Sequence, residues 1–370
     1  MKFNVASGEL VKSLSAVAGA VPAKATLAIL EMVLFESEEG KLKLSATDLE
    51  VSIIKYVEAD IEIEGAVAVP ARRLLETLRQ LPDIPVFFEV DERFNVEFKT
   101  DKGAYRLAGE HGDEFPAMPD MSESVIIETS TDIIQNAIQK TSFAVSNDDL
   151  RPAMMGVYFD IDTESSKVVA TDGHRLVKMT TTELTAEQAI DFIVPDKALS
   201  LTLKSLEALD CTISVNDEHI SLQSGNTRII ARLINQKYPN YDTVIPQDNE
   251  RLLTVNKDQM LSTVKRVAIF SSSTTRQIRL KLGQEEVTIN AEDIDMSSEA
   301  KETIEAEYSD EPMEIGFNAK YLLDVLSNVD DQEVLMEFST PNRAGIVKPA
   351  KQQPQSDILM LVMPVMLNSY

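Results

Sequence analysis

This chain of 370 residues has few of the residues that form disulfide bonds and metal sites: it contains one cysteine and three histidines. The single cysteine, Cys211, excludes an internal disulfide framework and a four-cysteine metal site, and it suits a reducing cytoplasm. The most apolar stretch, Ile358 to Leu367, contains a proline and is too short to span a membrane. The first residues, MKFNVASGEL, hold no apolar run of the kind that marks a secretory signal. These absences predict a soluble, cytoplasmic protein.

Motifs for catalysis and nucleotide binding are equally scarce. No G-x-S-x-G, Walker or dinucleotide-binding fingerprint occurs. None of the histidines, His111, His174 and His219, has a second ligand at a metal-binding spacing. One polar cluster, Asp172, His174 and Arg175 in the string TDGHR, keeps a cytosolic hydrolase or transferase open as an alternative. The expectation is nevertheless a protein with no catalytic residue, no metal and no cofactor.

The chain is strongly acidic, with a net charge of −26. Such a charge argues at first against a nucleic-acid partner, because DNA-binding proteins usually present a basic patch. It suits a second alternative, an acidic scaffold that binds basic proteins and never meets DNA. Total charge can mislead when the charge is segregated along the chain, so its distribution matters more than its sum.

Four landmarks recur three times in the same order: a strand before a helix, an alternating strand that ends in an acidic turn, an apolar strand before a second helix, and a hairpin. The acidic turns read SATDLE, VATDGH and NAEDID. Asp48 lies 124 residues before Asp172, and Pro70 lies 125 residues before Pro195. A period of this length is a whole α+β domain and not a short solenoid module. We expect domains at 1–122, 123–249 and 250–370.

Apolar residues at helical spacing predict six helices. Their expected ranges are 7–18, 71–80, 131–141, 196–207, 257–267 and 319–327. Asn256 with Gln259 predicts a helix cap. In the first hairpin, Phe94, Val96 and Phe98 alternate with polar residues, as in a strand with one buried face.

Charge is segregated between these helices and the rest of the chain. The six ranges hold eleven basic and seven acidic residues, whereas the remainder holds 24 basic and 54 acidic residues. If the helices share one face, that face is mildly positive and the strands carry the acid. Weak contact between such a face and DNA phosphates depends on salt and does not depend on the DNA sequence. An alternative is that Lys and Arg serve only helix propensity and solubility.

Several strings in the three repeats together resemble the bacterial DNA polymerase III beta subunit, the family of sliding clamps. They are KATLAILEMVLF, ATDLE, VPARRL, ATDGHRL, YPNY, MEIGFNAKYLLDVL and LVMPVML. The resemblance spans all three repeats, and the combination of ATDGHRL with a terminal VMP is specific.

The resemblance implies three similar α+β clamp domains per chain, joined head to tail in a two-chain, six-domain ring with helices lining the hole and sheets outside. It implies a processivity factor without catalytic activity that encircles duplex DNA. Its implied partners are a second copy of itself, sequence-independent double-stranded DNA, the replicative DNA polymerase, the clamp loader, and repair and replication proteins that carry a short clamp-binding peptide.

The resemblance also implies a peptide-binding cleft between the second and third domains. Carried over to this sequence, the cleft comprises Met154, Thr171, Gly173, His174, Arg175, Leu176, Pro239, Val244, Tyr321, Val362, Met363, Pro364, Val365 and Leu367. Thr243 and Met366 depart from the expected basic residues, and Asn368 to Tyr370 extend past the usual end. We therefore expect peptide preference to differ from other members.

Two further surfaces follow from the resemblance. The DNA-facing residues are Lys24, Arg72, Arg73, Arg79 and Lys197, and the dimer-interface residues are Tyr105, Leu107, Ile269 and Phe270. The acidic edge strand from Glu299 to Tyr308 is expected to face Arg72 and Arg73. Asp148, Pro152, Ala153 and Asp196 depart from the residues expected near DNA.

Overall fold

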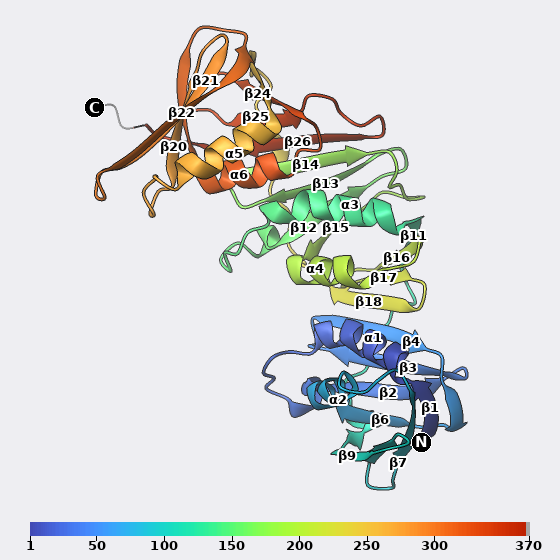
Figure 1. The fold of residues 1–370 in the computed structure, drawn as a ribbon. Helices are drawn as coiled ribbons and strands as arrows, with labels where there is room; N and C mark the ends of the chain where they lie inside the picture. The colour runs from blue at the N-terminus through green and yellow to red at the C-terminus, as the bar shows by residue number, and fades with distance from the viewer. Residues whose placement is uncertain (368–370) are drawn as a thin grey trace. The chain divides into compact units, whose positions relative to one another are not determined.

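The computed structural model describes residues 1–367 and forms two compact units (Figure 1). The first unit comprises Met1–Gln135 and Val194–Ile234, and the second comprises Asn136–Ile193 and the chain from Asn235 onward. The predicted extension from Asn368 to Tyr370 lies outside the described residues. Within the described residues, no helix is long and apolar enough to cross a membrane.

The first unit contains two sheets. The five-stranded sheet has the order β5 (Asp60–Ile63), β1 (Lys2–Ala6), β7 (Pro85–Val90), β8 (Asn95–Lys99), β9 (Ala104–Ala108). The nine-stranded sheet has the order β10 (Glu110–His111), β6 (Ala66–Pro70), β2 (Met32–Glu38), β3 (Lys41–Thr47), β4 (Val51–Val57), β18 (Thr227–Arg232), β17 (His219–Ser224), β16 (Asp210–Val215), β11 (Val125–Ser130). Strands of the first and second repeats thus share one sheet.

The second unit is built on a sheet of thirteen strands. Its order is β15 (Ile190–Pro195), β12 (Gly156–Ile161), β13 (Ser166–Thr171), β14 (Arg175–Thr181), β26 (Ser356–Val362), β25 (Gly345–Pro349), β24 (Glu333–Phe338), β19 (Arg251–Asn256), β22 (Ser298–Tyr308), β21 (Glu286–Asp293), β20 (Gln277–Leu282), β23 (Met313–Asn318), β27 (Pro364–Val365). Strands of the second and third repeats share this sheet, at the pair β14–β26.

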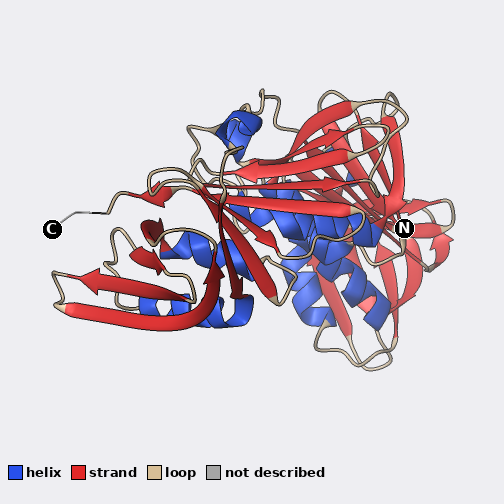
Figure 2. Ribbon diagram, turned by 90° about the horizontal axis from the view of Figure 1, so that it is seen from above, coloured by secondary structure: helices blue, strands red, loops and turns tan. Residues whose placement is uncertain are grey.

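All six predicted helices are present, with bounds within about two residues of the expected ranges. They are α1 (Ser7–Val17), α2 (Ala71–Leu78), α3 (Thr131–Thr141), α4 (Asp196–Ser205), α5 (Lys257–Ala268) and α6 (Ala319–Ser327). In Figure 2 they appear in blue beside the red strands on which they pack. Each helix buries a stripe of apolar residues; α2, for example, buries Leu74, Leu75 and Leu78.

The repeated acidic turn has a structural cause. The Asp48 carboxylate accepts hydrogen bonds from the N–H groups of Glu50 (3.0 Å) and Val51 (2.7 Å), which closes the turn between β3 and β4. In the third repeat, Asp293 accepts one from the N–H of Met296 at 3.2 Å. Short acidic side chains can satisfy backbone donors in this way at tight turns. The acid therefore recurs because each repeat turns at the same place.

Two local expectations need correction. Phe94 lies in the turn before β8, with a φ of 60°, so the buried alternation starts at Val96. The acidic strand is an edge over part of its length only: Ala306 and Tyr308 pair with β19, whereas Ser298–Glu305 pair on one side, with β21. The strand's free edge among the described residues is therefore shorter than predicted.

The predicted cap at Asn256 is confirmed, since its side chain accepts a hydrogen bond from the Gln259 N–H at 3.0 Å. Replacing a capping side chain by alanine costs about 1 kcal/mol, whereas glycine costs a few tenths. We expect Asn256→Ala to lower the free energy of unfolding, measured by urea denaturation, by about 1 kcal/mol. Asn256→Gly is the matched variant and should lower it by about a third of that amount. Equal losses for the two variants would contradict a capping role.

Candidate functional site

The turn between β13 and β14 lies at the centre of the predicted cleft. The Asp172 carboxylate accepts hydrogen bonds from the N–H groups of His174 (2.8 Å) and Arg175 (2.9 Å). The Thr171 hydroxyl accepts one from the Gly173 N–H at 3.1 Å and donates one to the Arg175 carbonyl at 2.7 Å. Gly173 has a φ of 87°, a left-handed conformation that residues with a Cβ disfavour. The turn itself therefore requires a glycine at this position of the predicted cleft.

Arg175 is buried, at 7% exposure, and connects this turn to α6. Its guanidinium donates to Asp172 at 3.2 Å and forms an ion pair with Asp324. The same group lies 5.5 Å from the ring centroid of Phe143 and 5.2 Å from that of Tyr321, within cation–π range. Arg175, which was predicted to be a cleft residue, thus already has two carboxylates and two aromatic rings as neighbours.

Three predicted cleft residues from separate elements meet beside this arginine. The His174 ring stacks on the Tyr321 ring, with centroids 5.4 Å apart and planes 10° from parallel. The His174 carbonyl accepts a hydrogen bond from the Met363 N–H at 2.8 Å. Burial, assisted by the charge of Asp172, raises the pKa of Tyr321, so its phenol stays neutral. The result is a flat aromatic surface next to a paired cation.

The C-terminal strands hold the rest of the predicted set in place. Strand β26 pairs with β14, with Val362 opposite Arg175. Strand β27 pairs with β23, with Pro364 opposite Phe317 and Val365 opposite Gly316. A Cβ on Gly316 would meet a side-chain carbon of Leu367 at 2.7 Å, so the glycine lets the end of the described chain lie against β23.

A hollow of about 500 Å³ opens beside these strands and is lined by Val244, Met363, Arg343 and Thr243 among others. Val244 is 52% exposed and Met363 is 41% exposed. Exposed apolar side chains at the edge of such a hollow are typical of peptide-binding surfaces.

The predicted cleft residues differ in how accessible they are. Leu176 and Val362 are almost fully buried, at 1% exposure each, so they support the cleft and offer it little surface. Met154, at the end of the 3-10 helix η5 (Pro152–Met154), and Pro239, on the loop after β18, are half-buried.

Sequence reasoning missed three residues that hold or border the turn: Phe143, Asp324 and Arg151. The guanidinium of Arg151 would lie 2.8 Å from a Cβ on Gly173, and Asp324 lies 149 positions from Arg175 in the chain. No motif marks these residues, because each acquires its role from a long-range contact.

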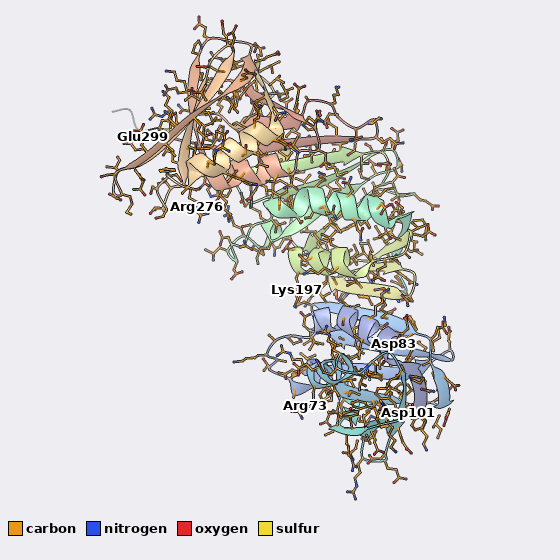
Figure 3. The ribbon with its side chains drawn as sticks, viewed as in Figure 1. Arg73, Asp83, Asp101, Lys197, Arg276 and Glu299 are labelled. Atoms are coloured by element: carbon orange, nitrogen blue, oxygen red, sulfur yellow. The ribbon has the colours of Figure 1, made fainter. Side chains whose placement is uncertain are left out.

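The predicted DNA-facing residues lie in the first unit, and all five are exposed. Arg72, Arg73 and Arg79 lie on or directly after α2, with the buried leucines on its other face. Arg79 donates to the Ser15 hydroxyl at 3.0 Å, and Lys197 forms an ion pair with Asp48. Figure 3 labels Arg73 and Lys197 on α2 and α4. The charge of Lys197 is thus partly neutralised by its own chain.

The predicted interface residues lie on two separate elements. Tyr105 and Leu107 are on β9, which is the last strand of the five-stranded sheet; the Tyr105 ring stacks on Phe98 at 4.9 Å, and Leu107 is 7% exposed. Ile269 and Phe270 follow α5 and are 78% and 40% exposed. Large apolar side chains exposed to this degree mark an interaction surface when they cluster.

Models of the DNA polymerase III beta subunit match nearly the whole chain. The N-terminal domain model matches residues 1–119, the central domain model 128–240 and the C-terminal domain model 242–365. This chain belongs to the DNA polymerase III beta subunit family. The predicted family and its fold of three clamp domains per chain are confirmed.

Individual relatives agree with the family models. The beta sliding clamp of Vibrio cholerae is 30% identical over 99% of this chain and all of its own length. The solved sliding clamp of Pseudomonas aeruginosa has a TM-score of 0.93 at 29% identity, covering 99% of this chain and all of that one. The solved sliding clamp of Bacillus subtilis has a TM-score of 0.94 at 25% identity, with full coverage of both chains. As a beta subunit, the chain is a processivity factor of DNA replication.

Membership in the beta subunit family favours this role over a hydrolase or transferase with a site at TDGHR. In the structure, the Asp172 carboxylate is engaged by two backbone N–H groups and a guanidinium, as expected for a turn residue. The arrangement presents aromatic and apolar surface, which suits binding.

The Arg175–Asp324 pair of this beta subunit can be tested by stability. We expect Asp324→Asn to lower the free energy of unfolding by about 1–3 kcal/mol, because it removes one carboxylate from a buried guanidinium. Asp258→Asn, on the exposed surface of α5, is the matched control and should change it by less than about 0.5 kcal/mol. Similar effects of the two variants in urea denaturation would show that the pair adds nothing to stability.

Proposed function

We propose that two copies of this beta subunit close into a ring that encircles duplex DNA, and that the ring tethers other replication proteins through the cleft around Arg175 and Tyr321. The observation that carries the proposal is that both ends of the triplicated chain present unpaired strand edges. Among the described residues, β9 ends its sheet and Ser298–Glu305 of β22 pair on one side only. Unpaired edges attract further strands. A second copy would supply a partner strand for each of these two edges.

The proposal places the three domains at 1–122, 123–249 and 250–370. The family models for the first and central domains fall within the first two ranges, and the C-terminal model begins at residue 242. Two copies of three domains make six similar units, which a two-fold operator closes into a circle.

The helix face supplies the contact with DNA. The exposed cations Arg73 and Arg79 of this face, together with Lys24 on the loop after α1, would meet phosphates without reading bases, so that binding is weak and depends on salt. The acid concentrated on strands and loops repels DNA from the opposite face. A ring of this kind holds DNA by enclosure and needs no catalytic residue, metal or cofactor of its own, and it works in the cytoplasm.

The partners of the ring are the replicative polymerase, the clamp loader, and repair and replication proteins with a short, partly apolar peptide. The peptide would lie over the stacked rings of His174 and Tyr321 and reach the hollow beside Val244 and Met363. The methionine suits several different peptides, because its side chain is flexible and polarisable. A solved relative from Pseudomonas aeruginosa has griselimycin bound, which shows that this relative accepts a ligand.

The ring proposal predicts a topological dependence on DNA. After loading by a clamp loader, the protein should stay on a nicked circular plasmid during gel filtration and should be lost when one restriction cut linearises the circle. The reason is that an enclosed duplex can leave only through a free end. Equal retention on circular and linear DNA would exclude enclosure and favour ordinary electrostatic binding.

The cleft proposal predicts a specific loss of peptide binding. Tyr321→Ala should raise the dissociation constant of a fluorescent clamp-binding peptide roughly tenfold or more in anisotropy titrations, because aromatic anchors dominate such interfaces. Ser327→Ala, at the exposed end of the same helix, is the control and should leave the dissociation constant unchanged. An unchanged constant for Tyr321→Ala would remove the cleft from the proposal.

A further inference from the structure

The hollow beside Val244 and Met363 has a neighbour on the same sheet. This second hollow, of about 250 Å³, lies between residues 242–249, which precede β19, and the neighbouring strands β14, β26, β25 and β24 (Figure 1). Both hollows are lined by Ile245, Pro246 and Gln247. They are therefore two parts of one groove, which begins at the proposed cleft and continues across the sheet.

Strand β26 connects the two hollows along one face. Met363, directly after β26, lines the first hollow, and Leu359, four residues earlier, lines the second. Met363 continues the strand ladder, because its N–H donates to the His174 carbonyl at 2.8 Å. Residues two or four apart in a strand point to the same face of a sheet. The floor of the groove thus runs from Met363 to Leu359 without a change of face.

Hydrogen bonds fix the walls of the groove. The side-chain amide of Asn249 donates to the carbonyls of Glu337 and Ala344, both at 3.0 Å. The Arg343 guanidinium donates to the Asp248 carboxylate at 2.5 Å. These bonds attach the segment before β19 to the hairpin of β24 and β25. The groove is therefore already formed in the chain alone, which lowers the cost of ordering it around a partner.

The groove is richer in positive charge than the rest of the chain. Lys178 and Lys348 line the second hollow from β14 and β25, with side chains 24% and 27% exposed. With Arg343, the two hollows have three cationic side chains against the two carboxylates of Asp248 and Glu337. In the whole chain, acidic residues outnumber basic ones by 61 to 35. This local balance favours an acidic partner segment.

The ion pairs of the two lysines leave both ammonium groups able to bind a further carboxylate. Lys178 lies 3.4 Å from the carboxylate of Asp242, whose side chain is 58% exposed. Lys348 lies 3.0 Å from the carboxylate of Glu337. An ammonium group has three N–H donors, so each lysine can take a second carboxylate and keep the first. Ion pairs exposed to this degree are also weak, so rearranging them costs little.

We propose that this groove binds an acidic segment that flanks the clamp-binding peptide of a partner protein, with Lys178 and Lys348 pairing its carboxylates. This inference rests on the cleft proposed above and names the class of partner that the cleft favours. The apolar part of the peptide occupies the hollow beside Val244 and Met363, and its acidic flank passes over residues 245–247 into the second hollow.

The length of the flank follows from the floor of the groove. Met363 and Leu359 are four strand residues apart, a distance of about 13 Å. A flank of about four extended residues therefore reaches the second hollow. Pairing at the edge of an interface selects among partners that share one apolar sequence, and it weakens with salt.

Anisotropy titrations with flanked peptides test the choice of partner in the full-length protein. The peptides share one apolar clamp-binding sequence and carry about four Asp, Ser or Lys residues, placed in turn at either end. At low salt, the Asp flank at one end should lower the dissociation constant about fivefold relative to the Ser flank. High salt should remove that advantage. An Asp flank that improves binding at neither end would overturn the inference.

Lysine substitutions assign the effect to the groove. Lys178→Glu with Lys348→Glu should abolish the preference for the Asp flank and leave the dissociation constant of the Ser-flanked peptide unchanged. Lys178→Gln with Lys348→Gln is the milder pair, which avoids repulsion from Glu337. Lys41→Glu with Lys281→Glu, exposed and outside both hollows, makes the same change of net charge as the first pair and should keep the preference. A preference that survives in both groove variants would show that the acidic flank binds elsewhere.

The Ser-flanked peptide separates this inference from the cleft itself. If it binds the unchanged protein and Tyr321→Ala raises its dissociation constant, the cleft stands and the flanks alone decide the inference. If no peptide binds at any concentration tested, the cleft and the inference both fall.

Discussion

Hydrogen bonding between strands of successive repeats is the interaction on which the rest of this structure depends. A single repeat has strand edges whose N–H and C=O groups need partners. The pair β4–β18 supplies them between the first and second repeats, and β14–β26 does so between the second and third. Each repeat is therefore completed by its neighbour. Within residues 1–367, β9 of the first repeat and Ser298–Glu305 of β22 in the third repeat have no such neighbour.

The acidic turn adds a second constraint at the same junctions. In the first repeat, the carboxylate of Asp48 closes the turn and also pairs with Lys197. In the second, Asp172 closes the turn and holds Arg175, which reaches Asp324 on α6. One small acidic residue thus sets local backbone geometry and ties adjacent repeats together. The proposed cleft around His174 and Tyr321 lies at the second of these junctions, so in this proposal a turn motif also carries the binding surface.

Charge is also segregated between the helices and the rest of the chain. The helices hold an excess of basic residues and the remaining chain an excess of acidic ones, so a net charge of −26 is compatible with a face that tolerates DNA. Weak, unspecific contact is an advantage for a protein that must move along DNA, because tight base contacts would stop it. Lys197 shows the limit of counting charges, since its ammonium group is already paired within the chain.

The sequence by itself determined the repeats, the six helices, the hairpins, the cap at Asn256 and the family. These features depend on local periodicity, turn chemistry and strings of adjacent residues, all of which can be read along the chain. Tertiary structure alone decided that Asp324 and Phe143 hold Arg175, that Leu176 and Val362 are buried, and that β22 is an edge over part of its length. Such contacts join residues far apart in the chain, and no local pattern encodes which distant side chain will meet which.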